Sequence, residues 1–266
     1  MAVFTAVLCT VQAAVPAETA PSPRPAIAII IDDLGQKLGA GVRAVMLPAP
    51  LTYSFLPHTP YAKSLARLAH ARNKEVMMHL PMEALDHRPL GPGGLHPGMS
   101  RDEFVRVVME NLASVPHVRG INNHMGSLLT QKERPMRWLM EEIVRLRPLY
   151  FIDSHTSRHS IAQAVAREYH IPTLRRHVFL DHEREPAAIA HHFRRLLALA
   201  RRQGVALAIG HPHPETLAFL EAALPRVAAE GIDILPVSRL IQRAAMLESP
   251  GNAPLLARRP AATLPQ

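Results

Sequence analysis

Short apolar segments alternate with longer segments of helical periodicity along most of the chain. In the first apolar segment, residues 27–31, every position is apolar, which is typical of a strand buried on both faces of a parallel sheet. We expect further strands over residues 51–56, 75–79, 118–124, 149–153, 172–181, 205–209 and 232–235. Helices are expected between them, over residues 39–46, 60–70, 100–114, 133–146, 160–169, 186–203 and 215–229, with a short one after residue 238.

This order of strands and helices predicts the α/β class, with seven or eight units in a TIM-like (β/α) barrel. An open doubly wound sheet is the alternative, but no glycine-rich phosphate loop follows any of the strands. After the third strand, residues 86–99 contain four glycines and three prolines, so this loop either covers a site or is simply mobile.

Polar residues that can bind a metal follow the apolar segments directly. Asp32 and Asp33 end the first one, and two neighbouring carboxylates there are costly to ionise unless a cation or hydrogen-bond donors lie between them. Caps of the following helix are the alternative role for these two residues. Four later strands end in the same way, in the segments 75–79, 118–124, 149–155 and 205–211. Because parallel strands end at one rim of a barrel, the repetition predicts a shared site, with a metal ion as the simplest occupant.

The composition and the two terminal segments limit which partners, location and domain organisation the chain can have. The formal net charge of +8 over 266 residues comes mainly from arginines that are dispersed through helices, which argues against nucleic acid as a partner. Residues 1–14 resemble a signal peptide that is too short to span a bilayer stably, so export to the periplasm is expected. Residues 15–25 are predicted as a proline-rich linker, 26–247 as one domain and 248–266 as a disordered tail.

Six motifs along the chain carry a resemblance to a known family. They are residues 30–35 (IIDDLG), 55–57 (FLP), 78–83 (MHLPME), 122–127 (NNHMGS), 151–154 (FIDS) and 209–213 (IGHPH). Over residues 26–242 the sequence resembles the divergent polysaccharide deacetylase (YibQ-like) family, which is related to the NodB-type carbohydrate esterases. The resemblance implies a distorted seven-stranded (β/α) barrel and a divalent metal, usually zinc, held by Asp and His.

The resemblance also implies roles for individual residues. Asp32 matches the general base of the NodB-type pattern, Asp33 and His79 match metal ligands, and His211 matches the general acid. The pattern has a second histidine four residues after the first, where this chain has Glu83.

The third ligand is therefore either Glu83 or His124. We favour His124 because imidazole is the commoner zinc donor and its strand end faces the same rim. Asp153, Ser127 and His213 are expected to support the ligands or to contact substrate, and the remaining histidines to be structural or solvent-facing.

Three functions follow from these expectations. The first is a zinc-dependent hydrolase that removes acetyl groups from an envelope polysaccharide or a peptidoglycan-type glycan. The second is a catalytically silent barrel that binds glycan or an envelope protein, which the departure at Glu83 favours. The third is a metal hydrolase that acts on another type of bond, since the same site chemistry serves several substrates.

Overall fold

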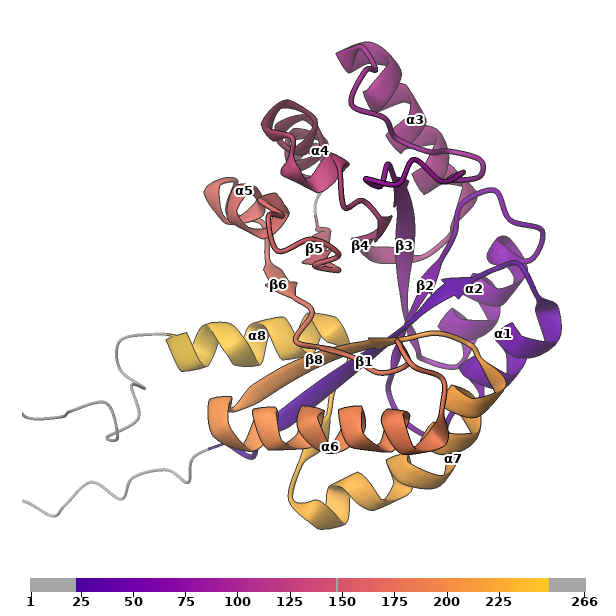
Figure 1. Cartoon of the computed structure of the whole chain (residues 1–266), viewed down its shortest axis with the longest axis vertical. Helices are drawn as coiled ribbons and strands as arrows, with labels where there is room; N and C mark the ends of the chain where they lie inside the picture. Colours follow the sequence, from indigo (N-terminus) through magenta and orange to yellow (C-terminus); the bar gives the residue numbers. More distant parts are fainter. Residues whose placement is uncertain (1–22, 147, 249–266) are drawn as a thin grey trace, which may run out of the picture.

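The computed structural model describes residues 23–146 and 148–248, which form one α/β unit (Figure 1). The predicted signal peptide, most of the predicted linker and all but the first residue of the predicted tail lie outside these residues.

All strand pairs in the described residues are parallel and belong to one sheet, in the order β6-β5-β4-β3-β2-β1-β8-β7, with β9 paired to β1. The strands are β1 (Ala26–Leu34), β2 (Thr52–Phe55), β3 (Glu75–Met82), β4 (Val118–Met125), β5 (Tyr150–Asp153), β6 (Thr173–Arg175), β7 (Val178–Phe179), β8 (Val205–Gly210) and β9 (Asp233–Ile234). The helices are α1 (Leu38–Val45), α2 (Ala62–Ala71), α3 (Arg101–Ser114), α4 (Glu133–Arg145), α5 (Ala162–Glu168), α6 (Pro186–Gln203), α7 (Pro214–Val227) and α8 (Val237–Glu248), with short 3₁₀ turns η1 (Leu129–Gln131) and η2 (Ala228–Glu230).

The sheet curls so far that its two end strands, β6 and β7, are separated by only two residues of the chain. Arg176 donates its backbone N–H to Asp153 of β5, and His177 donates to Leu207 of β8. The segment predicted as a single strand over residues 172–181 therefore changes partner in its middle, which splits it into two short strands. Counted as one position, this segment makes the distorted barrel of about seven strands that the sequence predicted.

Alternate residues of each strand face the inside and the outside of this barrel. In β1, Ile27, Ile29 and Ile31 belong to a core with the outer helices, whereas Ala28 and Ile30 belong to a second core inside the barrel. Both faces are buried, which explains why this strand is apolar at every position. The same alternation in the neighbouring strands directs their even or odd residues to the interior.

Helices cover the outer face, while α8 closes the inside. In the core clusters, α1, α2, α6 and α7 pack on β1, β2 and β8, and α3, α4 and α5 pack on β3, β4 and β5 (Figure 1). Residues of α8 instead join the interior cluster at the amino-terminal ends of the strands. The expected helices 100–114 and 186–203 match α3 and α6 to within one residue: Ser100 caps α3 by accepting from the N–H of Glu103, and Gly204 ends α6 with a φ of 83°.

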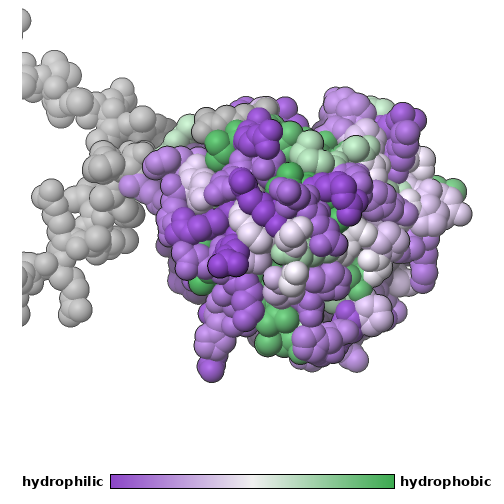
Figure 2. All heavy atoms as spheres, turned by 90° about the horizontal axis from the view of Figure 1, so that it is seen from above, coloured by the Kyte–Doolittle hydropathy of each residue, from purple (hydrophilic) through white to green (hydrophobic). Residues whose placement is uncertain are grey.

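The outer surface is mainly hydrophilic on the face shown in Figure 2, with apolar side chains scattered among polar ones. Among the described residues, no helix combines the length and the apolar character that crossing a bilayer requires.

Candidate metal centre and active site

A bulge at the end of β1 turns two neighbouring carboxylates toward the same place. Asp32 follows Ala28 and Ile30 in the inward-facing series, so the alternation alone would point Asp33 outward. The register with β2 shifts between Ile31 and Leu34, and Asp33 adopts a left-handed φ of 56°. Asp tolerates this conformation better than most residues do. The extra residue lets Asp32 and Asp33 face one barrel mouth.

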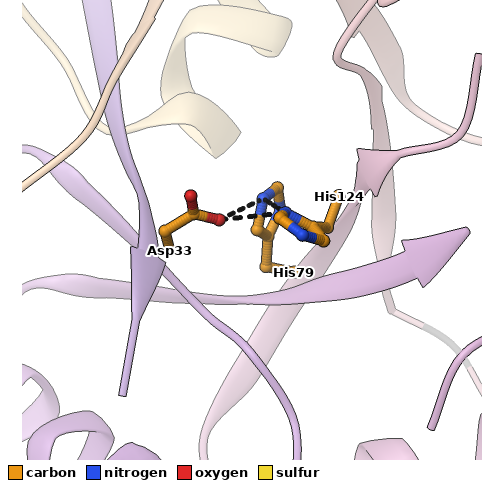
Figure 3. Close-up of side chains that lie close together, drawn as sticks. All are labelled: Asp33, His79 and His124. Atoms are coloured by element: carbon orange, nitrogen blue, oxygen red, sulfur yellow. Dashed lines mark hydrogen bonds and ion pairs between the residues drawn. The ribbon is translucent and has the colours of Figure 1, made fainter. Parts of the chain in front are cut away.

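Asp33 of β1 meets two histidines at this mouth, His79 of β3 and His124 of β4 (Figure 3). Its Oδ1 atom lies 2.9 Å from Nδ1 of His124 and 3.3 Å from Nε2 of His79, and these two nitrogens are 3.2 Å apart. Asp33 Oδ1 is buried and has no hydrogen bond of acceptable geometry within the described part of the chain. One carboxylate oxygen and two imidazole nitrogens that converge in this way match the donor set of a three-ligand zinc or related divalent site.

The charge state of Asp33 suits a ligand. Burial opposes its ionisation, but contacts with His124 and His79 outweigh that effect and hold the pKa of the carboxyl well below its usual range. His79 is almost fully buried, whereas Asp33 and His124 remain partly accessible to solvent. The cluster is therefore open on one side, as a catalytic metal centre requires.

Asp32 lies beneath the cluster and is buried. Both of its oxygens accept hydrogen bonds from Nδ2 of Asn122, at 3.0 Å each, and its Oδ2 is 3.6 Å from Nε2 of His79. Burial raises the pKa of Asp32 above its ordinary value, although His79, His211 and Asn122 partly offset the effect. A raised pKa brings a carboxylate closer to the range in which it accepts protons effectively near neutral pH.

His211 directly follows β8 and faces the cluster, and Asp181 holds it in place. Asp181 accepts from Nδ1 of His211 at 2.9 Å and from its backbone N–H at 2.6 Å, and Thr216 donates to the same carboxylate at 2.8 Å. The other ring nitrogen, Nε2, points toward Asp33 Oδ2 at 3.8 Å. Burial lowers the pKa of His211, but the hydrogen bond and charge of Asp181 outweigh it and raise the value to about 9.

A pocket of about 250 Å³ opens beside these groups. Asp33, His124 and His211 line it, together with residues of the β1–α1 turn such as Gln36 and Lys37. Asp33, His124 and His211 thus share one small cavity, and the buried Asp32 and His79 contact this group from beneath.

Comparison with known proteins identifies the family. The sequence profile of the divergent polysaccharide deacetylases matches residues 29–241. The chain belongs to this family.

Related chains support this assignment. The uncharacterized protein YibQ of Escherichia coli K12 is 38% identical over 195 residues, which are 73% of this chain and 61% of that protein. The match therefore spans less than two thirds of the E. coli protein. An uncharacterized protein of Haemophilus influenzae is 34% identical over 214 residues, 80% of this chain and 76% of that one.

Solved structures show the same fold. An uncharacterized protein from Agrobacterium tumefaciens C58 superposes with a TM-score of 0.79 at 23% identity, over 83% of this chain and 91% of that one. A CE4 family pseudoenzyme from Bacillus anthracis gives a TM-score of 0.50 at 14% identity, over 82% and 66% of the two chains. Another similar structure is that of a mutant of this pseudoenzyme with restored enzymatic activity.

The structure places Glu83 away from the cluster of Asp33, His79 and His124. Its carboxylate binds Nδ1 of His87 at 2.6 Å and Nδ1 of His96 at 2.8 Å. Strand β3 continues to Met82, so four residues beyond His79 correspond to about 13 Å along an extended chain, too far to share an ion. His87 and His96, expected to be structural or solvent-facing, tie the loop after β3 to this carboxylate.

The three residues predicted to support the ligands or contact substrate, Asp153, Ser127 and His213, each make different contacts. Asp153 follows the outward-facing Phe151 by two residues, and its carboxylate accepts from the N–H of His155 and the hydroxyl of Ser160. Within the described residues its hydrogen-bond partners include no histidine ring, so support of the ligands is not seen, and contact with substrate stays a prediction. Ser127 accepts from the N–H of Leu85 and so holds the loop. His213 lines the pocket and forms a second possible metal-binding group with Asp181 and His211.

Two residues of the site were assigned no role from the sequence, Asn122 and Asp181. Asn122 lies two residues before His124 in β4, so strand alternation could have predicted that both side chains face inward. Asp181 ends the segment predicted as one strand over residues 172–181, but the chain changes partner within that segment, so a single strand did not indicate which way Asp181 faces.

Proposed function

We propose that this protein is a metal-dependent hydrolase that removes acetyl groups from a glycan, with zinc as the metal. The observation that carries the proposal is the Asp33–His79–His124 cluster at a small pocket, with the Asp181-bound His211 on the same pocket and the buried Asp32 in contact with His79. The family and the fold support a carbohydrate substrate.

Asp33, His79 and His124 would hold the ion, through Oδ1, Nε2 and Nδ1 respectively. When bound, a divalent ion supplies an acidified water molecule and polarises the acetyl carbonyl. Asp32 accepts a proton of the attacking water on a carboxylate oxygen, from a position fixed by Asn122.

His211 completes the reaction at its other end. Asp181 keeps Nδ1 protonated and bound, so Nε2 faces the pocket and carries the proton that the departing group needs. The acyl carbon–nitrogen bond of an acetamide then breaks, acetate leaves with the oxygen of water, and the amine takes the proton of Nε2. An acetyl ester follows the same balance and releases an alcohol.

The substrate is proposed to be a polysaccharide or peptidoglycan-type glycan of the bacterial envelope, reached by export. Support for export is the apolar amino-terminal segment of residues 2–14, which ends in small residues. The second candidate is a barrel that binds glycan without turning it over, and the fold it shares with a CE4 pseudoenzyme favours this alternative.

One experiment tests the enzyme proposal. The protein, supplied with zinc, cobalt or nickel, is assayed for acetate release from acetylated chito-oligosaccharides, peptidoglycan fragments and a synthetic acetyl ester. Asp32→Asn should keep the metal content of the wild type and lose turnover by about 10²-fold or more, as general bases typically do. His211→Ala should behave in the same way, whereas Asp33→Ala and His79→Ala should lose the metal itself.

Each outcome has a clear meaning. A wild-type protein with no more metal than Asp33→Ala and His79→Ala would refute the metal centre. Wild-type turnover retained by both Asp32→Asn and His211→Ala would refute the assigned roles. Metal binding without acetate release from any substrate would favour the silent barrel.

A further inference from the structure

Asn122 is the side chain on which the contacts beneath the candidate metal centre converge. It is fully buried in β4. Its Oδ1 atom accepts from Oγ of Ser54 at 2.6 Å and contacts Nδ1 of His79 at 2.9 Å. Its Nδ2 atom donates to both oxygens of Asp32 and lies 3.3 Å from Oγ of Ser154.

These partners fix which way the amide faces. With nitrogen and oxygen exchanged, the carbonyl oxygen would lie against two carboxylate oxygens of Asp32, so acceptors would face acceptors. Ser54 donates its hydroxyl proton to the oxygen in the observed orientation, and this orientation satisfies every partner.

The amide orientation in turn fixes the tautomer of His79. Because an amide oxygen only accepts hydrogen bonds, Nδ1 of His79 must carry a proton. The lone pair of the neutral ring then lies on Nε2, the atom 3.3 Å from Asp33 Oδ1 and 3.2 Å from Nδ1 of His124. This is the form in which a histidine can ligate a metal through Nε2.

We propose that Asn122 is a positioning residue that couples the metal ligand His79 to the general base Asp32. Its oxygen sets the tautomer of His79, and its nitrogen holds both oxygens of the Asp32 carboxylate beside His79. The part that concerns Asp32 rests on the proposed function, whereas the part that concerns His79 is tested by metal binding alone.

A purely structural role would require only that a buried polar group be satisfied. Asn123, the next residue of β4, illustrates that case, because it bonds to the backbone carbonyl of Met125 and the backbone N–H of Ser154. The amide of Asn122 instead contacts side chains of the site, including those of His79 and Asp32. An apolar residue of similar volume would fill the same interior position. Packing alone therefore does not explain the amide, whereas its hydrogen bonds to side chains of the site do.

Two substitutions separate the two halves of the proposal. Asn122→Leu removes both the acceptor for His79 and the donor for Asp32. Asn122→Asp keeps an acceptor for His79 and for Ser54, but it places a second carboxylate against Asp32. The matched control is Asn111→Leu, since Asn111 is equally buried and bonds to Gly93 and His58 rather than to the cluster.

Zinc affinity is measured by competition with a chromophoric chelator, beside the thermal unfolding midpoint of the metal-free protein. Asn122→Leu should lose about 10- to 100-fold in zinc affinity, as is typical when the partner of a ligating histidine is removed. Asn122→Asp should stay within a few-fold of the wild type. Asn111→Leu should lower the unfolding midpoint without changing zinc affinity.

Turnover supplies the second readout. Asn122→Asp should lose at least about 10²-fold in kcat despite its bound zinc, because Asp32 is no longer held by a donor. Wild-type zinc affinity in Asn122→Leu, or an equal loss of affinity in Asn122→Asp, would overturn the coupling. Wild-type kcat in Asn122→Asp would overturn the half that concerns Asp32. A wild-type protein that binds zinc but releases no acetate refutes the proposed function, while the ranking of zinc affinities still decides the role toward His79.

Discussion

At the amino-terminal end of the barrel, the carboxylate of Glu75 accepts from three donors. They are the hydroxyls of Thr52 at 3.0 Å and Tyr150 at 2.8 Å, and the backbone N–H of Ser238 at 3.1 Å. At the carboxyl-terminal end, Asp33 Oδ1 is buried beside two imidazole nitrogens without a well-formed hydrogen bond. Both groups of side chains lie inside the barrel.

The difference shows which end is built for stability and which for chemistry. Around Glu75 each donor meets an acceptor, and the first turn of α8 obtains the partners that a helix start lacks. Around Asp33, atoms that ordinarily bind a cation face one another. Asp33 Oδ1 has no well-formed hydrogen bond in the described residues, so this end of the barrel departs from the rule that buried polar atoms are paired, as candidate functional sites often do.

The largest expected effect is the loss of a ligand at the carboxyl-terminal end. His124→Ala should lower zinc affinity by more than about 100-fold, beyond the range for residues that only support ligands. Glu83→Gln should leave zinc affinity within a few-fold, because its carboxylate binds His87 and His96. Competition with a chelator measures both.

The reverse ranking, with Glu83→Gln the more severe change, would move the ligand role to Glu83. It would also mean that the loop after β3 rearranges when metal binds.

A smaller effect is expected from Asp181→Asn, read in the pH dependence of turnover. His211 must be protonated to donate from Nε2, so wild-type turnover should fall as the pH rises through its pKa of about 9. Asp181 raises that pKa, so its replacement moves the alkaline limb to lower pH. If the pKa returns toward its ordinary value near 6.5, the loss at pH 8 is roughly 10- to 30-fold and nearly vanishes below pH 6.

His211→Ala is the control for this profile, since it should lose turnover at every pH. An alkaline limb that stays in place in Asp181→Asn would show that another group governs it.

The strand ends were predictable from sequence because period-2 burial is a strong constraint. An apolar segment that runs into Asp32, His79 or His211 predicts both the strand and the rim on which those residues lie. The family resemblance supplied their roles, and the distorted barrel is confirmed by the topology of the sheet.

What the sequence did not predict depends on local departures from that period. The bulge that brings Asp33 beside Asp32 is one extra residue of β1 in its pairing with β2, and no residue type in the sequence predicts it. Glu83 was considered as a ligand because the family pattern has a histidine at that position, but the length of β3 decides how far four residues reach. Asp181 follows a two-residue strand that exists only because the chain changes partner between β5 and β8.

The smallest expected effect concerns the amino-terminal end and tests whether the two ends are independent. Glu75→Gln keeps an acceptor oxygen for Thr52, Tyr150 and Ser238 but removes its charge, and hydrogen bonds to charged groups exceed neutral ones by about 1 kcal/mol. The free energy of unfolding, measured by urea denaturation of the metal-free protein, should fall by about that amount. Zinc affinity should be unchanged, because none of these three partners contacts the ligand cluster. A parallel loss of zinc affinity would instead mean that the packing of α8 inside the barrel is transmitted to the rim, and the separation of a stabilising end from a reactive end would no longer hold.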